Sequence, residues 1–213
     1  MPAPRRPNRP RCPSCAPAEP TGFVRVNGRT QVYAVLGDPV HHSRSPEIQN
    51  AAFAALGINA VYVALEVPAS RLAQALEGLH AARVAGINLT SPHKEAAFAL
   101  TRAHTADAEE SQAVNTLRWE PEGWQGHATD GAGFLAWIGE AKIDLSGRSV
   151  LVLGAGGAAR AVVPKLLDLG PETIRVVSRT VERARSLARG AGGRVSGKDP
   201  DQGGRPCRSS DRR

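Results

Sequence analysis

The 213-residue sequence lacks long apolar runs and has only three cysteines. No stretch approaches the roughly 20 apolar residues of a membrane-spanning helix, so no membrane partner is expected. The basic N-terminal segment is not followed by an apolar stretch, and we therefore expect no secretory signal. Cys12 and Cys15 form a C-x-x-C motif, but no second pair completes a zinc site and Cys207 is isolated. These absences argue against a metal site and predict a cytoplasmic protein, in which thiols stay reduced.

The middle of the chain also has little excess of basic over acidic residues, although the net charge of the whole chain is +7. Residues 1–20 and 190–213 each carry a net charge of +3, which leaves +1 for residues 21–189. Seven of the 16 prolines lie in residues 1–20, and residues 190–213 show no apolar periodicity. The basic segments are therefore predicted to be solvated, disordered tails, and no nucleic-acid partner is expected.

Apolar periodicity predicts an α/β fold for the first half of the chain. Strands and helices are expected to alternate, which favours a parallel sheet. The expected strands are residues 31–37, 61–65 and 85–89, and the expected helices are residues 46–56, 70–80 and 92–104. Two shorter strands at 113–119 and 123–129, joined by a turn at Glu122-Gly123, and a helix at 130–141 follow them.

A second unit starts at Arg148 with an apolar strand, a glycine-rich turn and a helix. One more strand and a helix that ends near Arg189 follow, and no element is expected after that. The expected division is a tail over residues 1–29, an α/β unit over 30–141, a shorter α/β unit over 142–190 and a tail over 191–213.

The glycine-rich turn of the second unit predicts a dinucleotide cofactor. Its glycines permit a tight turn and let main-chain N–H groups approach a pyrophosphate, while the helix N-terminus favours negative charge. The alternative is a turn that only packs the strand against the helix. The candidate cofactor-binding residues of this turn are Gly154, Ala155, Gly156, Gly157 and Ala158.

The end of the next strand, Ser178-Arg179-Thr180, determines which cofactor is expected. NAD-binding proteins usually carry an acidic residue there, which holds the ribose 2′-hydroxyl. Here Arg179, and Arg183 one turn later, offer guanidinium groups that can bind a 2′-phosphate in a bidentate manner. NADP is therefore favoured over NAD, unless both arginines are only solvated.

Polar residues of the first unit lie where strands are expected to end. Ser43 and Ser45 precede a helix, where Ser45 has the alternative role of a helix cap. Asn88 and Thr90 alternate with Leu89 at a strand end, so that both side chains are expected to face a ligand crevice.

Lys94 falls in the first turn of an expected helix, where the helix dipole disfavours a cation. This placement is expected to make proton exchange at the lysine easier. Asn115 follows a short apolar run and Asp130 opens a helix. The simpler alternatives are that Asn115 is a turn residue and that Asp130 is a helix cap.

Six motifs resemble the shikimate dehydrogenase family, in order, over about residues 31–190. They are VLGDPVHHSRSPEIQNAAF, GINLTSPHKEAAF, AVNTL, ATDGAGF, VLGAGGAARAV and SRTVERARSLA. The resemblance implies an N-terminal substrate-binding α/β domain, followed by a partial NADP-binding Rossmann domain, with the active site in the cleft between them. It also implies NADP-dependent interconversion of 3-dehydroshikimate and shikimate, in the shikimate pathway of aromatic amino acid biosynthesis, by a monomer or homodimer.

The resemblance further assigns site residues. Lys94 and Asp130 are implied as the catalytic pair, which takes the hydroxyl proton while the nicotinamide takes the hydride. The implied shikimate-binding residues are Ser43, Ser45, Asn88, Thr90, Lys94, Asn115 and Asp130.

Three departures from the family pattern accompany these matches. Ala128 and Ser178 each stand where the family usually has Asn, which puts the ordering of the loop at Ala128 in question. The family's C-terminal motifs are not recognisable after Arg189, so the chain resembles a C-terminally truncated member and is expected to be nearly inactive. The alternatives are a quinate/shikimate dehydrogenase that uses NAD, and a non-catalytic fragment that binds shikimate or nucleotide.

Overall fold

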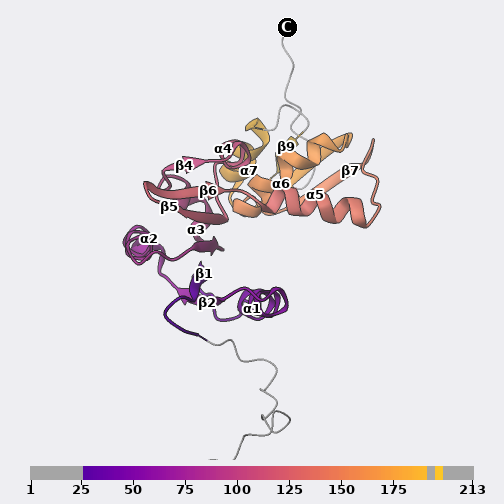
Figure 1. Ribbon diagram of the computed structural model, residues 1–213. Coiled ribbons are helices and arrows are strands. Elements are labelled where there is room, and N and C mark those ends of the chain that lie inside the picture. The colour runs from indigo at the N-terminus through magenta and orange to yellow at the C-terminus, as the bar shows by residue number, and fades with distance from the viewer. Residues whose placement is uncertain (1–25, 191–194, 199–213) are drawn as a thin grey trace, which may run out of the picture.

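The computed structural model describes residues 26–190 and 195–198, and it contains two β-sheets with flanking helices (Figure 1). The strands are β1 (Gln31–Gly37), β2 (Ala60–Glu66), β3 (Gly86–Leu89), β4 (Ala103–His104), β5 (Thr116–Glu120), β6 (Gly123–His127), β7 (Ser149–Leu153), β8 (Thr173–Val177) and β9 (Val195–Lys198). The helices are α1 (Ser45–Leu56), the short 3₁₀ helix η2 (Ala69–Arg71), α2 (Leu72–Ala81), α3 (His93–Phe98), α4 (Ala106–Ser111), α5 (Asp130–Glu140), α6 (Gly157–Asp168) and α7 (Val181–Gly190).

The first sheet has the strand order β2-β1-β3-β5-β6-β4. The predicted α/β class is confirmed, and so is the parallel pairing expected for the first three strands, because β1 pairs parallel with β2 and β3. β4, which was not predicted, pairs parallel with β6. β5 runs antiparallel to both β3 and β6. The short connection from Glu120 to Gly123 explains the antiparallel β5–β6 pair, because so tight a turn can join only antiparallel strands.

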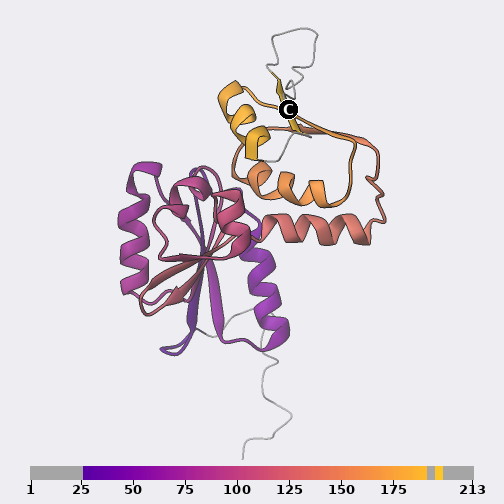
Figure 2. The ribbon, with the colours of Figure 1, turned by 90° about the horizontal axis from the view of Figure 1, so that it is seen from above.

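Two helices cover opposite faces of this sheet (Figure 2). Phe53 of α1 packs against Val35 and Tyr62 on one face. On the other face, Leu72 and Leu76 of α2 belong to the main core, together with Ala34 and Leu36 of β1 and with Ile87 and Leu89 of β3. Because side chains alternate along a strand, Asn88 faces away from this main core, toward the α1 side.

The helix expected over residues 92–104 is much shorter in the structure. α3 ends at Phe98, and the chain then forms β4 and a separate helix, α4. The Thr101 hydroxyl donates to the Phe98 carbonyl, and the Arg102 N–H donates to the Trp124 carbonyl of β6. Pairing with β6, which lies later in the sequence, therefore ends the helix. The apolar periodicity of residues 92–104 alone could not predict this pairing.

The second sheet has the order β7-β8-β9, with both pairs parallel. Its core contains Val163 and Leu166 of α6, Ile174 and Val176 of β8, and Ala184 and Leu187 of α7. The prediction that no element follows Arg189 is wrong for Val195–Lys198, which form β9. The prediction failed because β9 forms by main-chain hydrogen bonding to the open edge of β8, and such pairing does not require apolar periodicity in the sequence.

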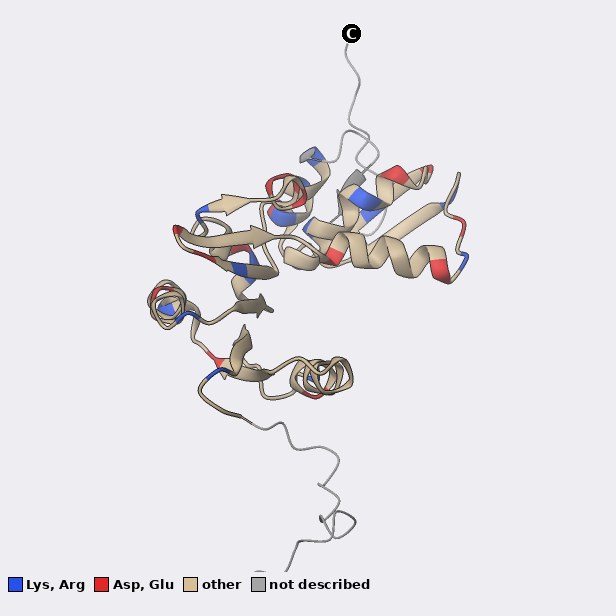
Figure 3. Cartoon of the chain, viewed as in Figure 1, with Lys and Arg blue, Asp and Glu red and all other residues tan. Residues whose placement is uncertain are grey.

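The rest of the predicted tails, and with them Cys12, Cys15 and Cys207, lie outside the described residues. Within the described part of the chain, no helix has both the length and the apolar character that crossing a membrane requires. Lys and Arg are interspersed with Asp and Glu over both sheets and their helices (Figure 3).

Candidate functional site

Lys94 and Asp130 form an ion pair at the junction of the two sheets. The Lys94 Nζ lies 2.6 Å from Asp130 Oδ2, and the two side chains are 18% and 28% exposed. Lys94 belongs to α3, whereas Asp130 is the first residue of α5. Asn115 Nδ2 donates to the other carboxylate oxygen, Asp130 Oδ1, at 2.7 Å. Both oxygens of Asp130 therefore have a partner, and the orientation of the carboxylate is fixed.

Asn115 also holds the start of α5 in place. Its Oδ1 accepts from the Thr129 N–H at 2.8 Å, and its Nδ2 donates to Thr129 Oγ1 at 2.9 Å. Thr129 is the N-cap residue of α5 and makes no side-chain capping bond. Asp130 is thus not the helix cap, and Asn115 does more than form a turn. Ala128 is 6% exposed in the main core, so the loop is ordered by Asn115 and by apolar packing, without an amide at position 128.

Asn88 connects to the same network through threonines. Its Nδ2 donates to Thr116 Oγ1 at 3.0 Å and lies 3.4 Å from the Asn115 carbonyl oxygen. Thr116 Oγ1 in turn lies 3.4 Å from Thr129 Oγ1. The structure therefore brings four predicted residues into one polar network: Asn88, Lys94, Asn115 and Asp130.

Of the other three predicted substrate residues, Thr90 and Ser43 lie in loops and Ser45 opens α1. Thr90 follows β3, and its Cγ2 sits so close to Gly37 that a Cβ there would collide with it. Ser45 is the first residue of α1 and Arg44 is the N-cap, so the predicted capping role of Ser45 is wrong. Ser43 Oγ accepts from the Ser45 N–H at 3.3 Å. Among the described residues, no hydrogen bond joins either serine to Asn88 or Lys94.

Three residues of the network were not predicted from the sequence: Tyr62, Thr116 and Thr129. The Tyr62 hydroxyl donates to Asn88 Oδ1 at 2.6 Å, and burial raises the pKa of Tyr62 to about 12. Thr116 and Thr129 lie within the AVNTL and ATDGAGF motifs, next to Asn115 and Asp130 in the sequence. This adjacency could have been used to predict them. No signal in the sequence marks Tyr62, which lies in an apolar strand.

The predicted glycine turn connects β7 to α6, and it touches the lysine. A Cβ at Gly157 would lie 2.8 Å from Lys94 Cβ, which is closer than real Cβ atoms approach, so only glycine fits there. Gly154 has a φ of +110°, and its N–H donates to the Val177 carbonyl of β8 at 2.7 Å. The turn is thereby held at the carboxyl ends of two adjacent parallel strands, which is where dinucleotides bind in open α/β sheets.

The local geometry fits a bound pyrophosphate. No atom lies within 4 Å of a Cβ built at Gly154 or Gly156, so the approach to the turn is open. Gly156 is the N-cap residue of α6 and the helix has no side-chain cap, which leaves main-chain N–H groups for an anion. Ala155 is buried and Ala158 is exposed.

The residues predicted for the 2′-phosphate follow β8. Arg179 and Thr180 are exposed, and so is Arg183, which belongs to α7. The Thr180 N–H donates to Ser178 Oγ at 3.3 Å, so this serine supports the turn. Neither arginine forms an ion pair within the described part of the chain. Exposed guanidinium groups beside the end of a strand suit a phosphate ligand.

Ion pairs link the two halves beside this site. Lys165 of α6 lies 2.7 Å from Asp107 and 3.0 Å from Glu110, both on α4. Hydrogen bonds to these two carboxylates raise the pKa of Lys165 above its usual value. Arg160 of α6 lies 3.7 Å from Glu95 of α3.

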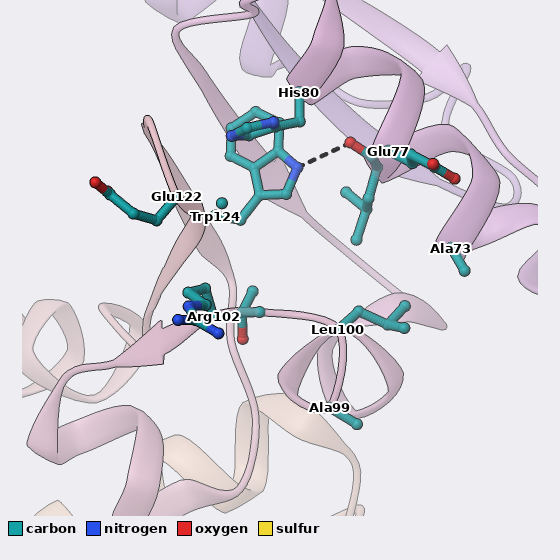
Figure 4. Close-up of a pocket in the computed structure, with 11 residues that line it drawn as sticks. Ala73, Glu77, His80, Ala99, Leu100, Arg102, Glu122 and Trp124 are labelled. Atoms are coloured by element: carbon teal, nitrogen blue, oxygen red, sulfur yellow. Dashed lines mark hydrogen bonds between the residues drawn. The ribbon is translucent and has the colours of Figure 1, made fainter.

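A separate hollow of about 370 Å³ lies on the other face of the first sheet (Figure 4). It is formed by α2, the segment after α3 and the β5–β6 hairpin, and residues such as Leu76, Leu100 and Trp124 line it. The Trp124 indole N–H donates to the Leu76 carbonyl at 2.9 Å. None of the predicted site residues lines this hollow, so it is not part of the candidate site.

Comparison with protein families gives two matches, one that covers much of the first half of the chain and one that covers the second sheet. Residues 35–117 match the shikimate dehydrogenase substrate binding domain, and residues 138–199 match shikimate/quinate 5-dehydrogenase. A shikimate dehydrogenase (NADP(+)) of Anaeromyxobacter sp. (strain K) is 46% identical over 174 residues, covering 82% of this chain and 62% of that protein. The protein of the same name from Methanopyrus kandleri is 43% identical over 195 residues, covering 88% and 67%.

Solved structures agree with these matches. The shikimate dehydrogenase of Aquifex aeolicus superposes with a TM-score of 0.74 at 41% identity, over 80% of this chain and 64% of that one. The shikimate 5-dehydrogenase of Thermus thermophilus, solved in complex with NADP(H) and shikimate, gives a TM-score of 0.71 at 40% identity, over 78% and 62%. The chain thus spans less than two thirds of the length of several relatives it matches.

Proposed function

The chain belongs to the shikimate dehydrogenase family, and on this premise we propose that it acts in the NADP-linked interconversion of shikimate and 3-dehydroshikimate. The observation that carries the proposal is the 2.6 Å Lys94–Asp130 pair directly beside the glycine turn at Gly157. A group that exchanges protons and a turn that suits a dinucleotide are thereby next to each other. Oxidation of an alcohol needs this arrangement, because the proton and the hydride leave neighbouring atoms.

We propose that residues 30–141 form the substrate-binding domain and that residues 142–190 form the cofactor-binding domain. The six-stranded sheet with its polar network supports the first assignment. The second is supported by the parallel pair β7–β8, the glycine turn and α6. Both ligands are small molecules in this proposal.

Lys94 is the residue that moves the proton in the proposed mechanism. In the direction of reduction, its ammonium group donates a proton to the oxygen that becomes the shikimate hydroxyl. In the direction of oxidation, the amine takes that proton back. Asp130 accepts a hydrogen bond from the Lys94 ammonium group, and the bond from Asn115 keeps the carboxylate aimed at Lys94. NADP, when bound, supplies the hydride chemistry.

The remaining polar residues hold the substrate in this proposal. Asn88, Thr90 and Asn115 can bond ring hydroxyls. The hydroxyls of Ser43, in the loop before α1, and of Ser45, at the start of α1, suit the carboxylate of shikimate. The glycine turn, from Gly154 to Ala158, binds the pyrophosphate of NADP through its N–H groups. Arg179 and Arg183 bind the 2′-phosphate, with Ser178 and Thr180 shaping the turn beneath it.

A turnover assay with a matched lysine variant tests this proposal. Because the chain itself is expected to be nearly inactive, the rate of NADPH formation from shikimate is measured in a full-length form that carries these residues, for the parent, for Lys94→Ala and for Lys142→Ala, which changes a lysine after α5. Loss of the proton-exchanging group should lower kcat by about 10²- to 10⁴-fold with little change in KM, while Lys142→Ala should behave as the parent. A Lys94→Ala variant that keeps most of its kcat would exclude Lys94. A parent chain that neither turns over nor binds shikimate would contradict the whole proposal.

A further inference from the structure

The Tyr62 side chain reaches across the first sheet to the substrate network. It starts on β2, and its hydroxyl donates to Asn88 Oδ1 on β3 at 2.6 Å, although β1 lies between these two strands. Tyr62 is 4% exposed, among Val35, Val40 and Phe53. A buried hydroxyl needs a partner, and here Asn88 is that partner.

Contacts on both sides fix the orientation of the Asn88 amide. Its oxygen accepts from Tyr62, while its nitrogen faces Thr116 Oγ1 at 3.0 Å and the Asn115 carbonyl oxygen at 3.4 Å. A main-chain carbonyl can only accept, so the amide nitrogen belongs on that side. The oxygen therefore points toward Tyr62, and the amide presents a defined set of donors and acceptors to the cleft.

The main chain of Tyr62 is also tied to helix α1. Asn50 Nδ2 donates to the Tyr62 carbonyl at 2.8 Å, and the Tyr62 N–H donates to Asn50 Oδ1 at 2.9 Å. Asn50 lies on the same helix as Ser45. Tyr62 is thus bonded to the helix that carries one part of the proposed substrate site and to the amide that forms another part.

We propose that Tyr62 is a positioning residue for the substrate: its hydroxyl holds the Asn88 amide in the orientation that a ring hydroxyl of shikimate meets. This inference rests on the proposed function for its ligand, and it adds a residue that touches the substrate only through Asn88. The hydroxyl is the essential group, because the ring is already packed against Val35 and Phe53.

Tyr62→Phe removes that hydroxyl and keeps the ring. The Kd of shikimate is measured by calorimetric titration for the parent, Tyr62→Phe, Asn88→Ala and the double variant. Loss of one buried hydrogen bond should raise Kd about tenfold in Tyr62→Phe. In the Asn88→Ala background the same change should alter Kd less than about twofold, because a residue that acts through Asn88 has no effect without it. An equal, independent loss in both backgrounds would overturn the proposal.

Tyr33→Phe is the matched control. Tyr33 lies opposite Tyr62 on the neighbouring strand and is the other tyrosine of the chain. Its hydroxyl is 3.4 Å from Gln31 Oε1, at an exposed position. This variant should bind shikimate as the parent does.

A ligand-free measurement separates this inference from the proposed function. The side-chain NH₂ signals of Asn88, assigned by their loss in Asn88→Ala, are recorded by ¹H–¹⁵N NMR without shikimate. Tyr62→Phe should shift or broaden them, and Tyr33→Phe should not. Unchanged Asn88 signals in Tyr62→Phe would overturn the inference, whether or not shikimate binds. Shifted signals in a chain that fails to bind shikimate would support the Tyr62–Asn88 link and contradict the proposed function alone.

Discussion

At the residue scale, hydrogen bonds to both carboxylate oxygens of Asp130 fix its position beside the Lys94 ammonium group. Lys94 is bonded to one oxygen of Asp130, and Asn115 is bonded to the other. Removing one member of a partly buried pair leaves the other without its counter-charge, which is more costly than losing an exposed pair. The network therefore keeps the proton-exchanging group in a single position before substrate arrives, so less ordering is needed upon binding.

The exposed arginines after β8 give a prediction about cofactor choice. Arg179→Ala should weaken NADP⁺ binding by about 1.5–3 kcal/mol, the usual contribution of one charge-assisted hydrogen bond, and should leave NAD⁺ binding nearly unchanged. The affinities are measured by titration of both cofactors. Arg175→Ala, an exposed arginine within β8, is the control and should change neither affinity. Equal NADP⁺ and NAD⁺ affinities in the parent chain would contradict the role of Arg179.

At the scale of elements, the crossing of α5 and α6 depends on a glycine. A Cβ at Gly131 would collide with the main-chain oxygen of Ala161 and would lie 2.9 Å from Lys165 Cγ. The two helices approach this closely because no side chain separates them. Gly131 directly follows Asp130, so the same contact helps to set where the carboxylate lies.

A pair of glycine variants on α5 tests this contact. Gly131→Ala should destabilise the chain by about 1–3 kcal/mol, as overpacking does. Gly133→Ala, on the same helix but with no atom within 4 Å of the added Cβ, should be neutral or stabilise by roughly 0.5–1 kcal/mol through helix propensity. The free energy of unfolding is measured by urea denaturation. Similar effects of both substitutions would show that the crossing is not tight at Gly131.

Local patterns in the sequence predicted the strands β1, β2 and β3 and the helices α1, α2 and α5 to within a few residues, because their apolar periodicity is strong. The end of α3 and the strands β4 and β9 were missed, since each depends on pairing with a strand elsewhere in the chain. The motifs predicted the network members Lys94, Asn115 and Asp130. Tyr62 was missed because its contact with Asn88 joins residues 26 positions apart and has no local signature.

For the whole molecule, the two sheets are joined by helix contacts and by ion pairs. α6 of the second half packs against α5, and its Lys165 reaches Asp107 and Glu110 of α4. The lysine side chain is 19% exposed, whereas the two carboxylates are 43% and 52% exposed. Solvent therefore screens part of the attraction, and each pair is expected to contribute at the level of surface salt bridges.

Lys165→Met should lower the free energy of unfolding by about 0.5–2 kcal/mol, and added salt should reduce the difference from the parent. A lysine whose pKa is raised in the folded state contributes stability below its ordinary pKa of 10.5 and loses it only as pH rises beyond that. The difference should therefore be the same at pH 7 and pH 9. Lys142→Met is the control. A difference that disappears by pH 9 would contradict the raised pKa of Lys165.

The proposed function requires that shikimate binds at the polar network of Lys94 and Asp130. The most direct test is calorimetric titration of shikimate into the parent chain, Asp130→Ala and Asp144→Ala, of which the last removes an exposed carboxylate that accepts from the nearby Ser146 N–H. The expected result is saturable binding to the parent, binding weakened about 10- to 100-fold by Asp130→Ala, and unchanged binding to Asp144→Ala. Equal shikimate affinity of Asp130→Ala and the parent would contradict the account.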